Sequence, residues 1–154
     1  MINYGKQSIN QDDIDAVVDV LKSDFLTQGP KVVEFENDLA NFCEATYAKV
    51  VNNGTAALHL SYLAIGLGPG DIVWTTPNTF VATANAALYC GATVGFVDID
   101  PKTYNLSIDC LKEKLVQAKK DNKLPKLVVP VHFAGQSCEM KAIWELSKEY
   151  GFKV

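Results

Sequence analysis

A regular alternation of short β-branched runs with longer helical patterns, which starts near Tyr47, constrains the fold of this chain most. Glycine-rich and polar turns separate the runs from the helical patterns. This rhythm predicts βαβ units, and therefore an α/β fold with a mainly parallel sheet and flanking helices. The expected strands are residues 48–51, 71–75, 93–97 and 126–131, and the expected helices are residues 55–65, 78–89, 107–119 and 138–150.

Two amphipathic stretches precede the alternating region. Residues 11–22 and residues 30–43 each place apolar side chains on one helical face, which predicts two helices. Pro30 suits the first turn of the second helix, where a missing N–H leaves no hydrogen bond unmade. We therefore expect an amino-terminal helical segment over residues 1–46 and a separate α/β domain over residues 47–154. The last three residues look like the start of a further strand, so we expect this domain to be incomplete.

Composition and charge narrow the classes of function. A net charge of −4 and a pI near 5.1 argue against broad binding of nucleic acid or anionic membranes. The sequence has neither an apolar run of bilayer length nor a signal-peptide pattern at its start, which predicts a cytoplasmic protein without membrane contact. The four cysteines have no metal-site spacing, and we interpret them as reduced thiols: Cys43, Cys90, Cys110 and Cys138.

Segments that directly follow the expected strands are the places to look for a ligand, because open α/β sheets bind ligands beyond the carboxyl ends of their strands. Residues 53–55 form one such segment and begin a helix. Its first N–H groups would attract a phosphate, with Gly54 allowing close approach and Thr55 adding a hydroxyl. The alternative is an ordinary helix cap made by Asn53 or Thr55. Neither a Walker loop nor a dinucleotide glycine fingerprint is present.

Other strand-end residues allow both a functional and a structural interpretation. Phe80, placed one step into the next expected helix, could stack on a flat cofactor or belong to the core. His132 could orient or protonate a substrate group, but a hydrogen-bonded structural histidine is the more common case. His59 is predicted to pack inside a helix. Asp98 and Asp100 could bind a cation, although such carboxylates usually form turns, and we predict no metal site.

Four motifs in order resemble the DegT/StrS-type sugar aminotransferases, and the resemblance covers essentially the whole chain. The motifs are Leu-Thr-Gln-Gly-Pro at residues 26–30, Asn-Gly-Thr-Ala-Ala-Leu-His-Leu at 53–60, Thr-Pro-Asn-Thr-Phe-Val-Ala-Thr-Ala-Asn-Ala at 76–86 and Val-Asp-Ile-Asp at 97–100. Within that family, residues 24–28 and 130–138 are most similar to the transaminases of pseudaminic acid biosynthesis. Those enzymes aminate the C4 keto group of a UDP-linked 4-keto-6-deoxy-N-acetylamino sugar, with glutamate as the amine donor.

The resemblance implies a homodimeric transferase of fold type I that uses pyridoxal 5′-phosphate (PLP), with each active site built from both subunits. Residues 47–154 would then be part of the PLP-binding large domain. Position-by-position matching implies that the cofactor contacts Gly54, Thr55, Ala56 and Phe80. It implies that the sugar nucleotide contacts Tyr4, Asp24, Phe25, Leu26, Thr27 and Gly54.

The resemblance also implies that the covalent chemistry is done elsewhere. Family members carry a Glu-Asp-Ala segment, whose Asp pairs with the pyridine nitrogen, and a later Lys that forms a Schiff base with the cofactor. Neither feature is found in this sequence. The sequence therefore predicts no catalytic residue in this chain, and we expect the 154-residue chain alone to be inactive.

Three other interpretations stay open at this point. A noncatalytic module that binds a sugar nucleotide or a partner would share the binding motifs. An NAD-type oxidoreductase would share the βαβ rhythm, although the missing glycine fingerprint disfavours it. A related branch of the family has His at the Schiff-base position and acts as a dehydratase.

Overall fold

A computed structural model describes residues 5–154, which form two compact units. Unit 1 ends at Val50, and unit 2 runs from Val51 to Val154. This division falls four residues after the boundary expected from the sequence. Tyr4, one of the predicted substrate contacts, lies outside the described residues. No helix within residues 5–154 has the length and apolar character needed to span a bilayer.

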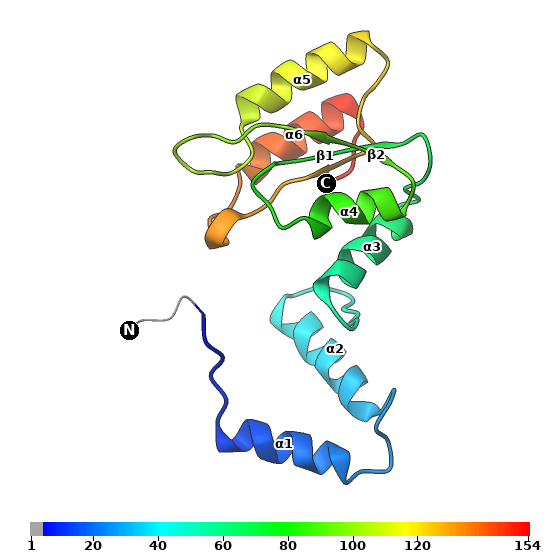
Figure 1. Ribbon diagram of the computed structural model, residues 1–154, viewed down its shortest axis with the longest axis vertical. Coiled ribbons are helices and arrows are strands. Elements are labelled where there is room, and N and C mark those ends of the chain that lie inside the picture. Colours follow the sequence, from blue (N-terminus) through cyan, green and yellow to red (C-terminus); the bar gives the residue numbers. More distant parts are fainter. Residues whose placement is uncertain (1–4) are drawn as a thin grey trace. The chain divides into compact units, whose positions relative to one another are not determined.

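Unit 1 contains two helices, α1 (Gln11–Leu21) and α2 (Pro30–Phe42), which confirm both predicted amphipathic helices (Figure 1). Asn10 and Asp13 close a capping box at the start of α1, because each side chain accepts a hydrogen bond from the other residue's backbone N–H. Pro30 occupies the first turn of α2, as its missing N–H suggests. Local signals therefore fix where both helices begin.

Residues 5–50 of unit 1 form no apolar core of their own. None of the residues of α1 is buried, and the one buried residue of α2 is Glu36. The Glu36 carboxylate accepts hydrogen bonds from Lys49 Nζ at 2.6 Å and from the backbone N–H of Val50 at 3.2 Å. Those two bonds, the Lys49 bond foremost, hold the pKa of Glu36 below its usual value. They tie the end of unit 1 back onto α2.

Unit 2 is built on a three-stranded parallel sheet in the order β2-β1-β3, which confirms the predicted fold class. Thr75, the last residue of β1, pairs with Phe96 of β2 and with Val129 of β3. The elements in chain order are α3 (Gly54–Ala64), β1 (Ile72–Thr75), α4 (Ala82–Tyr89), β2 (Thr93–Phe96), α5 (Ile108–Lys120), β3 (Leu127–Val129), the short 3-10 helix η1 (Phe133–Gly135) and α6 (Met140–Tyr150).

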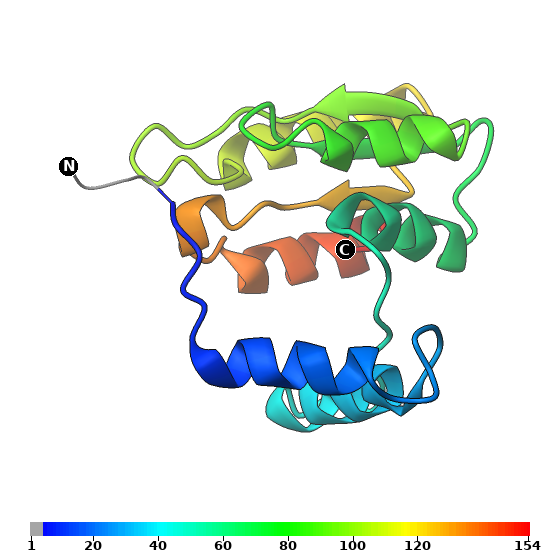
Figure 2. The ribbon, with the colours of Figure 1, turned by 60° about the horizontal axis from the view of Figure 1, so that its bottom comes forward.

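Two apolar cores hold this sheet between two pairs of helices. On one face, α5 and α6 contribute Leu111, Leu115 and Ile143, all fully buried. On the other face, α3 and α4 contribute Tyr62 and Ala86 among others, and Figures 1 and 2 show the two helix pairs on opposite sides of the strands. Burial raises the pKa of Tyr62 to about 12, so its hydroxyl keeps the proton that it donates to the backbone carbonyl of Thr83.

The outer strand β2 is covered by a lysine of α5. Lys114 Nζ lies 4.9 Å from the centre of the Trp74 ring and donates a hydrogen bond to the Phe96 carbonyl. Partial burial lowers the pKa of Lys114. Gly95 is required beneath this contact, because a Cβ there would lie 2.8 Å from Trp74 Cδ1.

Two expectations from the sequence need correction. Residues 48–51 do not form a strand, because a β-branched run becomes a strand only where another strand pairs with it, and none within residues 5–154 does so. Helix α4 begins at Ala82 rather than at residue 78, so Phe80 lies in the loop before the helix. The side chain of Asn78 instead makes a long contact to the backbone carbonyl of Tyr104, at 3.5 Å.

The last residues of the chain extend the sheet by one bridge. Lys153 pairs in parallel with Leu127, and its N–H donates to the Lys126 carbonyl at 2.8 Å. Its carbonyl accepts from the Val128 N–H at 2.9 Å. This pairing agrees with the predicted strand character of residues 152–154.

Candidate functional site

The candidate site lies in unit 2, at the edge of the sheet formed by the carboxyl ends of the strands. Helix α4 follows β1 and therefore starts at this edge. Helix α3 leads back into β1, so it also starts at this edge, and Figure 2 shows both helix starts on the same side of the sheet. The topology therefore gathers residues 53–56, residues 76–81 and the loop after β3 at one edge.

The start of α3 is compatible with both interpretations of residues 53–56, the helix cap and the phosphate-binding site. Asn53 caps the helix, because its Oδ1 accepts the Ala56 N–H at 2.8 Å. The N–H groups of Gly54 and Thr55 belong to the first turn, which has no partners in the helix's own ladder. A Cβ at Gly54 would meet nothing within 4 Å, so the approach to these groups is open. The residues present fit a phosphate that binds at Gly54 and Thr55, next to the Asn53 cap.

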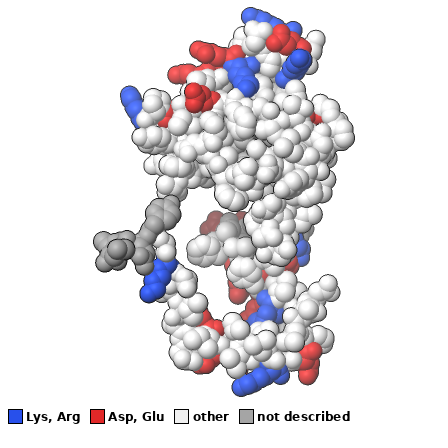
Figure 3. Space-filling model, viewed as in Figure 1, with Lys and Arg blue, Asp and Glu red and all other residues white. Residues whose placement is uncertain are grey.

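The scarcity of carboxylates around the start of α3 also favours binding of an anion there. Asp71 is the one charged residue between Val50 and Asp98 in the sequence. It lies at the opposite edge of the sheet, before β1, where its carboxylate pairs with Lys126 Nζ at 2.7 Å. On the face drawn in Figure 3, the charged side chains of unit 2 gather over α5 and leave the rest largely uncharged. No carboxylate from α3 or α4 competes with an anion at the start of α3.

Phe80 is not a core residue, since 76% of it is exposed. Its loop is held to the first turn of α4 by two contacts with Thr83. The Phe80 carbonyl accepts the Thr83 N–H at 3.1 Å, and the hydroxyls of Thr79 and Thr83 are 2.8 Å apart. An exposed aromatic ring on a fixed loop at the ligand edge is suited to stacking on a flat ligand. The stacking role itself stays a prediction.

His132 follows β3, and its Nδ1 accepts the Cys138 N–H at 3.1 Å. The loop between them is held by Asn105, which is 4% exposed. Asn105 Oδ1 accepts the Phe133 N–H at 2.9 Å, and Asn105 Nδ2 donates to the carbonyls of Gln136 and Ser137. Sequence reasoning missed Asn105, because nothing in its local spacing distinguishes it from an ordinary turn residue.

The remaining polar candidates are structural. Asp100 forms a turn, because its Oδ1 accepts the Lys102 and Thr103 N–H groups at 2.8 and 2.9 Å. These bonds, the Thr103 bond foremost, lower the pKa of Asp100. Asp98 Oδ1 accepts the adjacent N–H of Ile99. His59 contacts the Tyr89 ring edge-on at 5.6 Å, which confirms its packing role. Across residues 5–154, no group of His, Cys, Asp and Glu side chains has a metal-binding arrangement.

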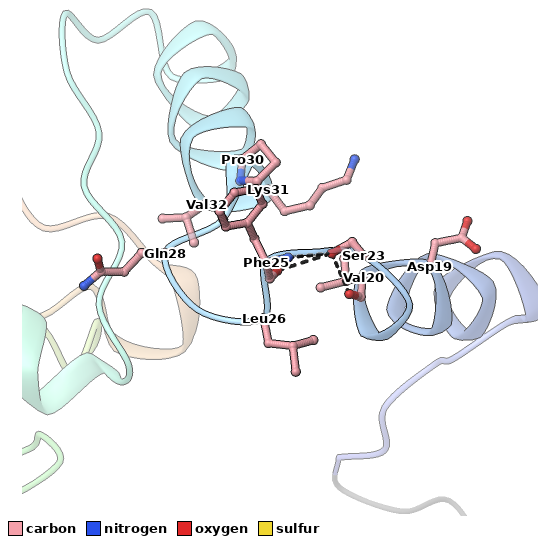
Figure 4. A pocket seen from close by; sticks show the side chains of 10 residues that line it. Asp19, Val20, Ser23, Phe25, Leu26, Gln28, Pro30, Lys31 and Val32 are labelled. Atoms are coloured by element: carbon pink, nitrogen blue, oxygen red, sulfur yellow. Dashed lines mark hydrogen bonds between the residues drawn. The ribbon is translucent and has the colours of Figure 1, made fainter.

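The predicted substrate contacts Asp24, Phe25, Leu26 and Thr27 follow one another in unit 1, in the loop between α1 and α2. Figure 4 shows Phe25 and Leu26 in this loop. Phe25 and Leu26 line a pocket of about 210 Å³, whereas Asp24 and Thr27 do not. Gly29 fixes this corner, because a Cβ there would lie 3.0 Å from both Cβ and the carbonyl oxygen of Phe25. The full lining is Asp19, Val20, Ser23, Phe25, Leu26, Gln28, Gly29, Pro30, Lys31 and Val32.

The chain is thus an α/β protein whose candidate ligand site lies at the carboxyl edge of a parallel sheet. A model of the DegT/DnrJ/EryC1/StrS aminotransferase family matches residues 7–154. The chain therefore belongs to this family.

Relatives of known sequence and structure agree with that assignment. The chain is 44% identical over 151 residues to the spore coat polysaccharide biosynthesis protein SpsC of Bacillus subtilis, covering 98% of the chain and 37% of SpsC. It is 45% identical over 150 residues to the UDP-4-amino-4,6-dideoxy-N-acetyl-beta-L-altrosamine transaminase of Campylobacter jejuni (strain 81-176), covering 97% of the chain and 39% of that protein. The chain thus spans less than half the length of these relatives.

Solved structures show the same fold. The aminotransferase PseC of Helicobacter pylori, described as involved in the biosynthesis of pseudoaminic acid, superimposes with a TM-score of 0.87 at 34% identity. That match covers 97% of the chain and 39% of PseC. The PLP form of the putative sugar aminotransferase Spr1654 of Streptococcus pneumoniae gives a TM-score of 0.87 at 29% identity, covering 99% of the chain and 38% of Spr1654.

Proposed function

We propose that this chain is the amino-terminal portion of a PLP-dependent aminotransferase that acts on a nucleotide-linked sugar. The observation that carries the proposal is the placement of an open helix start, at Gly54 and Thr55, and an exposed aromatic ring, Phe80, at the same edge of the sheet. A phosphorylated flat cofactor needs both. Membership of the family supports the reaction class.

The substrate that we propose is a UDP-linked 4-keto-6-deoxy-N-acetylamino sugar, aminated at C4 with glutamate as the donor. The support is the 45% identity to the Campylobacter jejuni transaminase, against 39% to a UDP-4-amino-4-deoxy-L-arabinose–oxoglutarate aminotransferase and 36% to a GDP-perosamine synthase. A role in the biosynthesis of pseudaminic acid, and of a polysaccharide that contains it, follows from this substrate. We further propose a cytoplasmic homodimer.

The predicted site residues have the following roles in this proposal. The N–H groups at Gly54 and Thr55 and the Thr55 hydroxyl hold the cofactor phosphate, and Phe80 packs on the cofactor ring. Ala56, whose N–H is bonded to Asn53, lies against the phosphate. Asp24, Phe25, Leu26, Thr27 and Gly54 contact the sugar nucleotide, as does Tyr4. When bound, PLP supplies the electron sink that amino transfer requires. We assign no catalytic residue to this chain, and expect residues 1–154 alone to show no turnover.

A half-reaction tests the proposal. The native protein, saturated with PLP, is mixed with glutamate, and the cofactor spectrum and the release of 2-oxoglutarate are followed. Free glutamate and PLP are then removed, the UDP-keto-sugar is added, and amination is read by mass spectrometry. We expect one oxoglutarate and one amino sugar per site. Tight binding of the sugar nucleotide without PLP would favour a noncatalytic module, bound nicotinamide an oxidoreductase, and loss of a sugar hydroxyl without amination a dehydratase.

A further inference from the structure

The loop from His132 to Cys138, after β3, is fixed more firmly than its exposed position requires. Three hydrogen bonds join it to the buried amide of Asn105, and the Cys138 thiol donates to the Val131 carbonyl at 3.1 Å. Ala134 and Gly135 both have left-handed backbones, with φ of 51° and 85°. A left-handed alanine is unfavourable by itself, so the loop keeps this shape because the surrounding bonds enforce it.

The position of one proton in this loop follows from the geometry. His132 Nδ1 accepts the Cys138 N–H at 3.1 Å, and a ring nitrogen that accepts a hydrogen bond carries no proton. In the neutral ring the proton is therefore on Nε2. The His132 side chain is exposed, and within residues 5–154 its Nε2–H donates to no acceptor. The loop thus presents a hydrogen-bond donor of fixed orientation.

The loop follows β3, the immediate neighbour of β1. The two strands are joined at their carboxyl ends, since Thr75 Oγ1 donates to the Val129 carbonyl at 2.9 Å. Phe80 comes five residues after Thr75, and His132 three residues after Val129. Both side chains therefore belong to loops that leave the sheet at adjacent points of the ligand edge.

We propose that His132 is a ligand-binding residue, whose Nε2–H donates to an anionic oxygen of the bound cofactor or of the amino-acid donor. Asn105 is the positioning residue that holds the loop in the required shape. This inference rests on the proposed function. The competing explanation is that His132 only completes the loop through its Nδ1, in which case Nε2 has no role.

The first test determines the tautomer of His132, and this measurement does not depend on enzymatic activity. Long-range nitrogen–proton NMR of the imidazoles identifies which nitrogen carries the proton. The chain has two histidines, and a His59→Asn variant assigns the His132 signals. We expect the neutral His132 ring to be protonated on Nε2 in the native protein, and to lose this preference in Asn105→Ala. A proton on Nδ1 in the unchanged protein would overturn the proposal.

Two substitutions separate the roles of the two ring nitrogens. In His132→Asn, the amide oxygen replaces Nδ1 as the acceptor for Cys138, but no donor reaches the Nε2 position. In His132→Gln, the longer amide supplies the donor but not the acceptor. We expect His132→Asn to unfold at the same temperature as the unchanged protein but to lose about tenfold or more in ligand affinity. We expect His132→Gln to be less stable but to recover part of that affinity.

Two measurements identify the acceptor. A raised dissociation constant for PLP in His132→Asn points to an oxygen of the cofactor. An unchanged PLP constant, with a raised half-saturating glutamate concentration in the half-reaction, points to an oxygen of the amino acid. If both constants match those of the unchanged protein, the proposal is wrong. Failure of the unchanged protein to bind PLP would instead refute the proposed function. The NMR measurement would still show which nitrogen of His132 carries the proton.

Discussion

The two units of this chain obtain their structure from different sources. Unit 2 buries side chains from each of its α-helices, with Leu111 and Leu115 fully enclosed. Unit 1 begins α1 with a capping box and α2 with a proline, but leaves most of the large apolar side chains of these helices exposed, among them Val17 at 60% and Leu21 at 64%. Capping and periodicity are therefore sufficient to define helices, but burial of apolar area supplies most of the free energy of folding. The two units should respond differently to the same substitutions.

Truncation of a buried leucine should give the largest effect. Leu111→Ala in unit 2 removes fully buried methyl groups, so we expect a loss of about 2–5 kcal/mol in the free energy of unfolding. The matched control is Leu21→Ala in unit 1, where the side chain is exposed and the expected change is within about 0.5 kcal/mol. Urea denaturation of the native protein measures both. Equal losses would mean that Leu21 is buried in the native protein.

Thr55→Val tests whether the start of α3 in unit 2 binds the phosphate of PLP. The substitution keeps the shape of the side chain but removes a hydroxyl that would bind a charged phosphate, so we expect PLP binding to weaken by about 1.5–3 kcal/mol. Spectral titration of the native protein with PLP measures this change. Thr93→Val, on the exposed part of β2, is the control and should bind PLP normally. An unchanged affinity for PLP in Thr55→Val would mean that the start of α3 is an ordinary helix cap and not a phosphate site.

Phe80→Ala should have a smaller effect on the same titration. The loss of stacking should weaken PLP binding by about 0.5–1.5 kcal/mol, while the thermal unfolding temperature stays the same because the ring is exposed. Phe42→Ala, which removes an exposed ring from unit 1, is the control and should leave PLP binding unaltered. A large drop in unfolding temperature for Phe80→Ala would show that the ring is part of a core.

The smallest effect concerns pH and the carboxylate of Glu36. Its pKa is lowered in the folded chain, chiefly by the hydrogen bond from Lys49. A lowered pKa contributes stability above the ordinary Glu range, and this contribution is lost as the pH falls through the folded value. The unchanged protein should therefore be slightly more stable than Lys49→Ala at neutral pH, and the difference should vanish in acid. Carbon NMR should find the Glu36 pKa raised in Lys49→Ala, and an identical pKa in both proteins would contradict the assignment.

The sequence predicted the features that depend on near neighbours. Helices α1 and α2 were predicted to within one residue at each end, because a capping box and a proline at the first turn act locally. The run at residues 48–51 was wrongly assigned as a strand, because pairing depends on distant parts of the chain. Asn105 was missed for the same reason, since its acceptors at Gln136 and Ser137 lie 31 and 32 residues away.

Lys114 has a consequence for how this protein behaves at high concentration. The outer strand of a sheet offers unpaired backbone groups, onto which a strand from another molecule can add. In the described sheet, β2 has a neighbour on one side only, and Lys114 occupies the Phe96 carbonyl with a charged group. Bringing a second strand against β2 would require this charge to be displaced and rehydrated. We therefore expect the contact between Lys114, Trp74 and Gly95 to disfavour aggregation through β2, and its loss to lower the solubility of the protein during storage.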